Sequence, residues 1–334
     1  MDQEIGIRSH PVKIPRWSGL VCIDKPTGIT SHDAVVRVRR RLKDRGIGHM
    51  GTLDPGASGL LVLALGSATR CIGVWQGGQK TYEATVRFGR TTDSQDMDGK
   101  ILEERPVSLD EATIRAATEA YVGDIEQLPP MVSALKVKGE RLHRIAREGR
   151  TVERARRRVH VTSWEWLDFQ LPEASFRVRC GGGTYVRTLA HDLGQALGSG
   201  ACLSALRRLR SEPFDVDQAV ALDDLDHLTH EEVFERAGQS LDAALECVPT
   251  VILEEGEAAE IGYGARPLLE VGERGVEPAL IGMGARSIVI RDAEGHALAM
   301  GELLAEGDSG THARVAPGLV FPWAVRHGRP REFE

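Results

Sequence analysis

The chain has 334 residues, 41% of them hydrophobic and 27% charged, which is ordinary for a soluble globular protein with room for two domains. It contains no run of about 18 uncharged apolar residues and no apolar signal-peptide segment, so composition argues against a membrane protein and predicts a cytoplasmic location. The five cysteines are scattered and odd in number, which predicts reduced thiols and argues against a zinc site.

The net charge of −7 hides a separation of charge along the chain. Residues 1–160 carry a net charge of +7, whereas residues 216–334 carry −14. Lysine and arginine gathered in one part of a protein create the attractive potential that a phosphate backbone requires. The positive charge of residues 1–160 therefore predicts that an anionic partner docks on this part of the protein, although the whole chain has a net negative charge.

Hydrophobic periodicity predicts a chain of mixed helices and strands without an internal repeat. Residues 1–17 lack periodicity and predict an irregular leader. Ser31 is the expected N-cap of a basic helix that continues to about Lys43. The other predicted helices cover 67–74, 110–121, 140–148 and 185–197, and the predicted strands cover 19–24, 60–65, 81–88, 124–128, 159–168 and 174–180, with a closing segment through Arg210.

Four further segments differ in composition. Residues 90–99 form an acidic turn that is similar to a calcium loop but lacks its closing glutamate, so we interpret them as structural. Residues 136–158 hold ten lysines and arginines against three glutamates, a pattern that also fits a solvated surface. Residues 216–249 are acidic and predict connecting helices. Short β-like runs at 268–271, 287–291, 297–303 and 312–315 predict a small barrel-like domain.

The stretch from Gly48 to Gly59 places one carboxylate, Asp54, in a loop of glycines and small residues. Glycines allow the backbone to approach a ligand closely, and Pro55 fixes φ directly after the acid. Asp54 is thus expected in a stiff turn, as a catalytic carboxylate would be presented. By itself, an Asp-Pro-Gly turn is more often purely structural.

This loop is one of five motifs that together are similar to a known family. In content, order and spacing they resemble the TruB-type pseudouridine synthases, over about residues 18–212. The chain departs from the family pattern at Met50, where Thr or Ser is usual, and at Cys180-Gly181-Gly182. The motifs are Gly19 to Gly28, Gly48 to Gly59, Lys80-Thr81-Tyr82, Gly183 to Thr188, and Leu206-Arg207-Arg208-Leu209.

The resemblance implies an α+β fold with a catalytic domain at 18–215, built on a mixed, largely antiparallel sheet. Within it, residues 131–158 would form a basic thumb-like insertion that grips RNA. Residues 216–249 would form an acidic helical connector to a small β-rich PUA-like domain at 250–327. The similarity to PUA domains, which are RNA-binding accessory modules, rests on residues 288–302, and the acidity of this part weakens the inference of RNA binding.

The implied activity is isomerisation of a uridine in the T-loop of tRNA, at position 55, to pseudouridine, without a cofactor or metal. The base must first leave its stack. Asp54 would act beside the ribose by attack at C1′, by addition to the ring or by proton abstraction, and these routes stay open. Arg187 would pair with Asp54 and keep it ionised. Tyr82 would stack on the flipped uracil and serve proton transfer at C5.

The resemblance also implies a set of substrate-binding residues, each of which has an ordinary structural alternative. Tyr185 would line the pocket and orient the arginine, and His49 would occupy the space that the flipped base leaves. Leu206 would form an apolar wall of the pocket, and Lys25, with Pro26, would support the loop. Arg141, Arg144 and Arg147, which share one helix face, would contact RNA.

Two other functions compete with this interpretation. One is a guide-RNA-directed, dyskerin-like synthase, and the thumb insertion argues against it because that branch lacks one. The other is an RNA-binding protein that remodels tRNA without catalysis, and the intact Asp54, Tyr82 and Arg187 argue against that. We expect a monomer that acts on tRNA with no guide RNA and no obligate protein partner.

Overall fold

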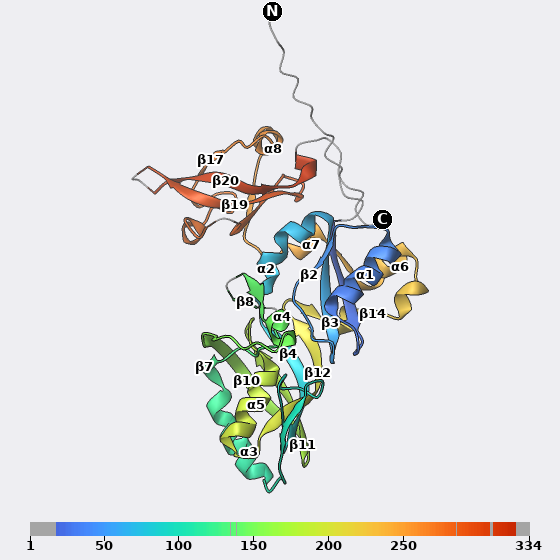
Figure 1. Ribbon diagram of the computed structural model, residues 1–334. Helices are drawn as coiled ribbons and strands as arrows, with labels where there is room; N and C mark the ends of the chain where they lie inside the picture. Colours follow the sequence, from blue (N-terminus) through green and yellow to red (C-terminus); the bar gives the residue numbers. More distant parts are fainter. Residues whose placement is uncertain (1–17, 134, 138, 285, 308–309, 325–334) are drawn as a thin grey trace, which may run out of the picture.

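The computed structural model describes residues 18–133, 135–137, 139–284, 286–307 and 310–324 (Figure 1). The predicted leader at 1–17 and the last residues of the predicted C-terminal domain, 325–327, lie outside the described residues. A large mixed sheet of eleven strands forms the main body, and a five-stranded sheet forms the C-terminal part. The predicted α+β class is confirmed.

The strands of the large sheet follow the order β14-β1-β3-β12-β4-β11-β10-β7, while β2 pairs with β3, β13 with β12, and β15 with β1. The pairs β1–β14 and β3–β12 are parallel and the other pairs are antiparallel. The bounds are β1 Gly19–Lys25, β2 Ile47–His49, β3 Ala57–Leu65, β4 Lys80–Phe88, β7 Gly123–Gln127, β10 Arg157–Gln170, β11 Glu173–Cys180, β12 Ala201–Ser211, β13 Phe214–Asp215, β14 Val220–Ala221 and β15 Gly238–Ser240.

Helices cover this sheet, and two small hairpins form separate two-stranded sheets. The hairpins pair β5 (Arg90–Thr92) with β6 (Ile101–Glu104) and β8 (Lys136–Val137) with β9 (Glu140–Arg141). None of the helices in the described ranges has both the length and the apolar character needed to span a bilayer. The helices are α1 Ser31–Leu42, α2 Ile72–Gln76, α3 Glu111–Thr118, α4 Leu142–Arg147, α5 Val186–Ala196, α6 His230–Ala237, α7 Leu241–Ala244 and α8 Glu255–Ile261.

The start of α1 differs from the prediction by one residue. Thr30 is the N-cap, and it exchanges hydrogen bonds with Asp33 in a capping box. Ser31 is instead buried as the first helical residue and bonds the backbone of Leu53. Both residues have capping side chains, so local preference does not distinguish them; the tertiary contact of Ser31 does.

Other predicted elements also change in extent or kind. The predicted helix at 67–74 is a 3₁₀ segment (Gly66–Cys71) followed by the short α2. The predicted helix at 140–148 begins as strand β9 before α4. The closing segment is β12, a central strand that pairs with both β3 and β4. Arg207, Arg208 and other polar residues interrupt its hydrophobic pattern, so the sequence alone does not predict a central strand here.

The acidic segment 216–249 is more than a helical connector. Its strands β14 and β15 pair with β1 and so extend the main sheet. Arg37 of α1 reaches Asp223 at 2.7 Å and Asp226 at 2.8 Å, and Arg41 donates to the carbonyl of Leu225. Part of the basic N-terminal surface is therefore neutralised within the chain and is not open to an anionic partner.

The C-terminal sheet follows the order β16-β18-β19-β20-β17 and packs beside α2 and α7 (Figure 1). Val289, Met300 and Phe321 share a hydrophobic cluster with the main body. Arg291 reinforces the contact by donating to the carboxylate and the carbonyl of Asp242, next to the start of α7. The bounds are β16 Thr250–Ile252, β17 Leu268–Glu270, β18 Ile288–Arg291, β19 Ala297–Glu306 and β20 His312–Val320.

Candidate active site

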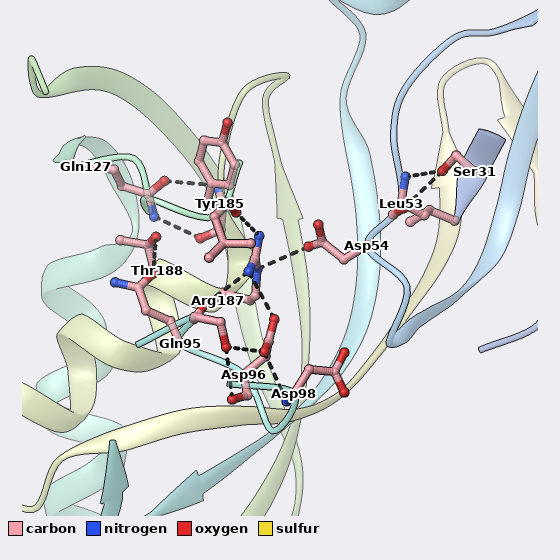
Figure 2. Close-up of polar contacts among 12 residues, drawn as sticks. Ser31, Leu53, Asp54, Gln95, Asp96, Asp98, Gln127, Tyr185, Arg187 and Thr188 are labelled. Carbon is pink, nitrogen blue, oxygen red and sulfur yellow. Dashed lines mark hydrogen bonds and ion pairs between the residues drawn. The ribbon is translucent and has the colours of Figure 1, made fainter. Parts of the chain in front are cut away.

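The loop that carries Asp54 is fixed from both sides. Before it, the Ser31 hydroxyl donates to the Leu53 carbonyl at 3.0 Å and accepts from the Leu53 amide at 2.8 Å (Figure 2). After it, the Pro55 carbonyl accepts from Gly28 at 2.8 Å, and the Asp54 carbonyl accepts from Ala57 at 3.0 Å. The carboxylate therefore projects from a braced turn, as the Asp-Pro-Gly pattern predicts.

Arg187 in the first turn of α5 meets this carboxylate. Its Nε lies 3.1 Å from Asp54 Oδ2, and its Nη1 lies 3.0 Å from Asp96 Oδ2 (Figure 2). Arg187 also donates to the carbonyls of Ser94 at 2.9 Å and Val132 at 3.0 Å. The residue is only 3% exposed, and these four acceptors explain how the cation is tolerated there. The structure thus brings Asp54 and Arg187 together.

Asp96 is a residue of the site to which the sequence assigns no role. It lies in the acidic turn 90–99, which the sequence predicts to be structural, and it shares Arg187 with Asp54. Hydrogen bonds from the Ser94 hydroxyl and the Asp98 amide hold the Asp96 carboxylate in place. A turn with the local signature of an ion loop thus supplies a second anion to the site.

The electrostatic balance at Asp54 also differs from the expectation. Burial raises the pKa of Asp54, Arg187 lowers it, and the negative Asp96 raises it again, so the pKa stays above its ordinary value. Arg187 therefore offsets the effect of burial only in part. Because 39% of the Asp54 side chain is exposed, the carboxylate remains accessible from solvent.

A cavity of about 380 Å³ opens beside this pair. Such a volume falls within the usual range for a small-ligand site. Tyr82, Tyr185 and Leu206, which come from β4, the start of α5 and β12, line it together with Asp54 and Arg187. Met50, a departure from the family pattern, lines it as well. Among the described residues, the cavity combines one carboxylate, the Arg187 cation paired with it, two further basic side chains (Lys80 and Arg208), and flat or apolar walls.

Tyr82 and Arg208 lie opposite each other on β4 and β12. Burial raises the pKa of the Tyr82 phenol, and the Arg208 cation beside it opposes that rise in part. Arg208 is 3% exposed and lines the same cavity. It belongs to a motif that carried the resemblance, but sequence reasoning gave it no role.

Tyr185 is held through its backbone by Gln127 at the end of β7. The Tyr185 amide donates to Gln127 Oε1 at 3.0 Å, and Gln127 Nε2 donates to the Tyr185 carbonyl at 3.2 Å (Figure 2). Burial also raises the pKa of the Tyr185 phenol, and Ser133 opposes that rise in part. Gln127, 1% exposed, is a second residue that sequence reasoning missed, because the pairing bridges two distant segments.

Lys25 and His49 do not line the cavity. Lys25 is fully buried, and its Nζ donates to the carbonyls of Pro26 at 2.7 Å and Ile29 at 2.9 Å. The prediction that Lys25 binds substrate is therefore corrected. Lys25 instead supports the turn whose Gly28 amide donates to the Pro55 carbonyl. His49 ends β2 and is half-buried.

The thumb-like segment is described only in part. Arg144 has 73% of its side chain exposed and lies 3.9 Å from Glu140 and 3.6 Å from Glu148. The side chains of Arg141 and Arg147 lie outside the described residues. Arg144 is thus accessible to an anion, which would compete with two intramolecular carboxylates.

One cluster in the described residues has the donor atoms that a metal ion requires. Asp292, Glu294 and His296 are the one group of acidic and histidine side chains, among those residues, with atoms close enough together to hold an ion. They lie in the turn between β18 and β19 of the C-terminal sheet, not beside Asp54. The Asp292–His296 contact, at 3.1 Å, is explained by the turn itself.

Two family models match consecutive parts of the chain. One describes the N-terminal domain of the TruB family pseudouridylate synthases and matches residues 39–186. The other describes the C-terminal domain of tRNA pseudouridylate synthase B and matches residues 187–251. The boundary falls at Arg187, so the two models divide the site between them.

Curated relatives match over most of their own length. A tRNA pseudouridine synthase B from Opitutus terrae is 49% identical over 219 residues, which cover 65% of this chain and 91% of the relative. A protein of the same name from Burkholderia mallei is 45% identical over 260 residues, covering 78% and 85%. Another, from Thermobifida fusca, is 45% identical over 257 residues, covering 74% and 86%.

Solved structures resemble the fold across both sheets. A crystal structure of a Cbf5-Nop10-Gar1 complex matches with a TM-score of 0.68 and 26% identity, covering 97% of this chain and 89% of that chain. An H/ACA RNP bound to a substrate RNA containing 2′-deoxyuridine matches with a TM-score of 0.65 and 24% identity, covering 94% and 92%. The latter likeness concerns the fold alone.

Proposed function

The chain belongs to the TruB family of pseudouridylate synthases, and we propose that it converts a uridine of tRNA, at position 55 in the T-loop, to pseudouridine. One observation carries the proposal: the Asp54–Arg187 ion pair of 3.1 Å forms part of the wall of a cavity that Tyr82 also lines. A single accessible carboxylate beside a pocket with a stacking ring suits chemistry on a flipped nucleoside.

The reaction rearranges the nucleoside without loss of a group. The C1′–N1 bond breaks, a C1′–C5 bond forms, C5 loses its proton, and N1 gains one. In the proposed complex the uracil enters the cavity against Tyr82 and Leu206, and its ribose lies beside Asp54. Stacking on an aromatic ring contributes about 1–3 kcal/mol per base, which helps offset the cost of unstacking the uridine.

Arg187 would act by holding Asp54 and by favouring its ionised form. Its bonds to Asp96, Ser94 and Val132 fix the guanidinium before substrate arrives. Preorganised charge of this kind needs no rearrangement as the reaction proceeds. Asp54 keeps three open routes: attack at C1′, addition to the ring, or proton abstraction.

We propose the same domain organisation as the sequence suggests: a catalytic domain at 18–215 with a thumb at 131–158, a connector at 216–249 and a PUA-like domain at 250–327. We further propose a cytoplasmic monomer that needs no guide RNA. The identity of 45–49% to tRNA pseudouridine synthase B proteins, against 26% to the chain from the Cbf5-Nop10-Gar1 complex, supports this choice.

Tritium release tests the proposal. Unmodified tRNA transcript carrying tritium at uridine C5 is incubated with the protein in the absence of guide RNA, beside a transcript whose T-loop uridine is replaced by cytidine. Release from the first transcript and not from the second is expected. Release only after addition of a guide RNA would favour the dyskerin-like alternative, and tight binding without release would favour a remodelling protein.

A further inference from the structure

Arg208 joins three parts of the site. Its Nε donates to the carbonyl of Leu60 in β3 at 2.8 Å, and its Nη2 donates to the carbonyl of Gly51 in the Asp54 loop at 3.2 Å. Its backbone pairs with Tyr82 on β4. One buried side chain thus connects the strand after Asp54, the loop before Asp54 and the strand that carries Tyr82.

The guanidinium of Arg208 and the phenol of Tyr82 line the same cavity from opposite positions of neighbouring strands. A guanidinium only donates hydrogen bonds, whereas a phenol both donates and accepts. A contact between the two groups would therefore use Arg208 as the donor and Tyr82 as the acceptor, and it would direct the phenol proton away from the guanidinium, toward the cavity.

We propose that Arg208 is a positioning residue that orients the Tyr82 hydroxyl toward the flipped base and ties it to the Asp54 loop. The proposal rests on the proposed function, because it assigns the hydroxyl to the proton transfer at C5. Arg208 does not touch the reacting atoms in this scheme. It acts through Tyr82 and through the carbonyl of Gly51.

Arginine suits this task better than lysine does. Its planar group presents five donors in a fixed geometry, so it can serve several acceptors at once, whereas an ammonium is a compact charge on a flexible stem. Lysine at this position would retain the charge beside Tyr82 but could not make all of the same hydrogen bonds. Glutamine would retain donors but not the charge.

Tyr82 titration provides a readout that needs no RNA. Tyrosine is labelled with an isotope at the ring carbon that bears the hydroxyl, and the resonance of Tyr82, one of four tyrosines, is assigned by its loss in Tyr82→Phe. The other titratable or charged groups around Tyr82 are the same in every variant compared. They are Lys80 on β4, Cys180 on β11, Asp54 in its loop, and Tyr185 and Arg187 at the start of α5.

In Arg208→Gln the Tyr82 resonance should shift and titrate at higher pH than in the wild type, because the cation that opposes the effect of burial is gone. Arg208→Lys should titrate closer to the wild type. The single-turnover rate of Arg208→Gln should fall about tenfold or more, while tRNA affinity stays within about threefold. Arg208→Lys should recover part of the rate.

Arg210→Gln is the matched control, an exposed arginine two residues further along the same strand. It should leave the Tyr82 resonance and the rate unchanged. An Arg208→Gln protein whose Tyr82 resonance and titration match the wild type would overturn the proposal, even if its activity were low. Equal losses of rate and thermal stability in the Gln and Lys variants would also overturn it. If no variant, including the wild type, modifies tRNA, the proposed function fails while the titration still decides the contact.

Discussion

Asp54 Oδ2 and Arg187 Nε lie 3.1 Å apart, yet the pKa of Asp54 stays above its ordinary value because burial outweighs the attraction of the cation. Asp96 contributes to this balance, since it draws on the same guanidinium and adds negative charge. Ionising Asp54 is therefore less favourable in the folded protein than in the unfolded chain.

Asp54→Asn should abolish turnover while leaving a folded protein that binds tRNA. The amide keeps the volume of the carboxyl and can still accept a hydrogen bond from Arg187, but it lacks the negative charge that each catalytic route requires. Single-turnover tritium release with saturating protein is the measurement. Asp168→Asn, an exposed carboxylate on β10, is the control and should react normally. A rate for Asp54→Asn within about tenfold of wild type, or about 1.4 kcal/mol in barrier, would contradict the assignment.

The same substitution should change how stability depends on pH. A carboxyl with a raised pKa in the folded state binds its proton more tightly there than when unfolded, so its contribution to the free energy of unfolding falls as pH rises. The fall begins near the ordinary value of 3.8 and ends above the folded pKa.

Wild type should therefore lose stability relative to Asp54→Asn across this range, and the difference should then be constant to neutral pH. Denaturant unfolding of both proteins at a series of pH values measures it. At neutral pH the inactive variant should be at least as stable as the wild type. A wild type that gains stability over the variant as pH rises would mean that Arg187 dominates burial.

The thumb hypothesis predicts a change in salt dependence. Neutralising Arg141, Arg144 and Arg147 together should flatten the plot of log affinity for tRNA against log salt by about 0.7–0.9 for each phosphate that no longer has an arginine partner. The rate at saturating RNA should change less. Arg115→Gln is the control: this exposed arginine on α3 pairs with Glu111 at i,i+4, as Arg144 does with Glu148. If the slope is unchanged in the triple variant, these arginines form a solvated surface and do not contact the RNA phosphates.

The sequence predicted the Asp54 loop because the loop is one contiguous motif, and it predicted the pairing with Arg187 because the family that the motifs resemble pairs these two residues. Asp96 lies 91 residues before Arg187, and its local pattern is that of a turn. Only the pairing of distant segments shows that the turn faces the site. The sequence does not predict the role of Gln127 for the same reason, because its partner Tyr185 is 58 residues away.

The sequence shows how much charge each part of the chain carries, but not whether that charge faces solvent or pairs within the protein. The basic first half of the chain, which includes α1, predicted docking of an anionic partner, but Arg37 of α1 pairs with carboxylates more than 180 residues later in the chain. Segregated charges in a sequence attract each other in the fold as readily as they attract a partner. The strands β14 and β15 were missed for a related reason: they are very short, and pairing with β1 defines them more than any pattern of their own.

Gly59→Ala should destabilise the protein by more than backbone strain alone. Gly59 has φ of +100°, and a Cβ there would lie 2.3 Å from the carbonyl oxygen of Arg208. The parallel pairing of β3 with β12 leaves no room for that atom. Left-handed backbone costs about 1–2 kcal/mol for a residue with a Cβ, and the clash adds to it.

Gly123→Ala is a matched control, because Gly123 has φ of +95° but no atom within 4 Å of the added Cβ. Thermal unfolding should show a small loss for Gly123→Ala and a larger loss for Gly59→Ala. Because Gly59 pairs with Arg208, Gly59→Ala should also lower activity at temperatures where the protein stays folded. Equal losses in the two variants would mean that β12 moves away at little cost.

Tyr82 allows stacking to be separated from proton transfer. Tyr82→Phe keeps the ring, and with it most of the roughly 1–3 kcal/mol of stacking, but it removes the hydroxyl that Arg208 faces. Binding should survive and single turnover should not. Tyr82→Leu removes both functions and should also weaken the complex with tRNA. Because Tyr82 packs against both large hydrophobic clusters, the Leu variant should lose thermal stability as well, whereas the Phe variant should keep it.

The measurement is the single-turnover rate beside tRNA affinity and thermal midpoint for each protein. A tyrosine with a purely structural role would lose rate and stability in parallel in both variants. A Phe variant as fast as wild type would remove the hydroxyl from the mechanism and leave Tyr82 as a stacking surface. In that case the C5 proton would need another acceptor in the cavity, and Asp54, the one carboxylate that lines it in the described part of the chain, would have to take both parts of the chemistry.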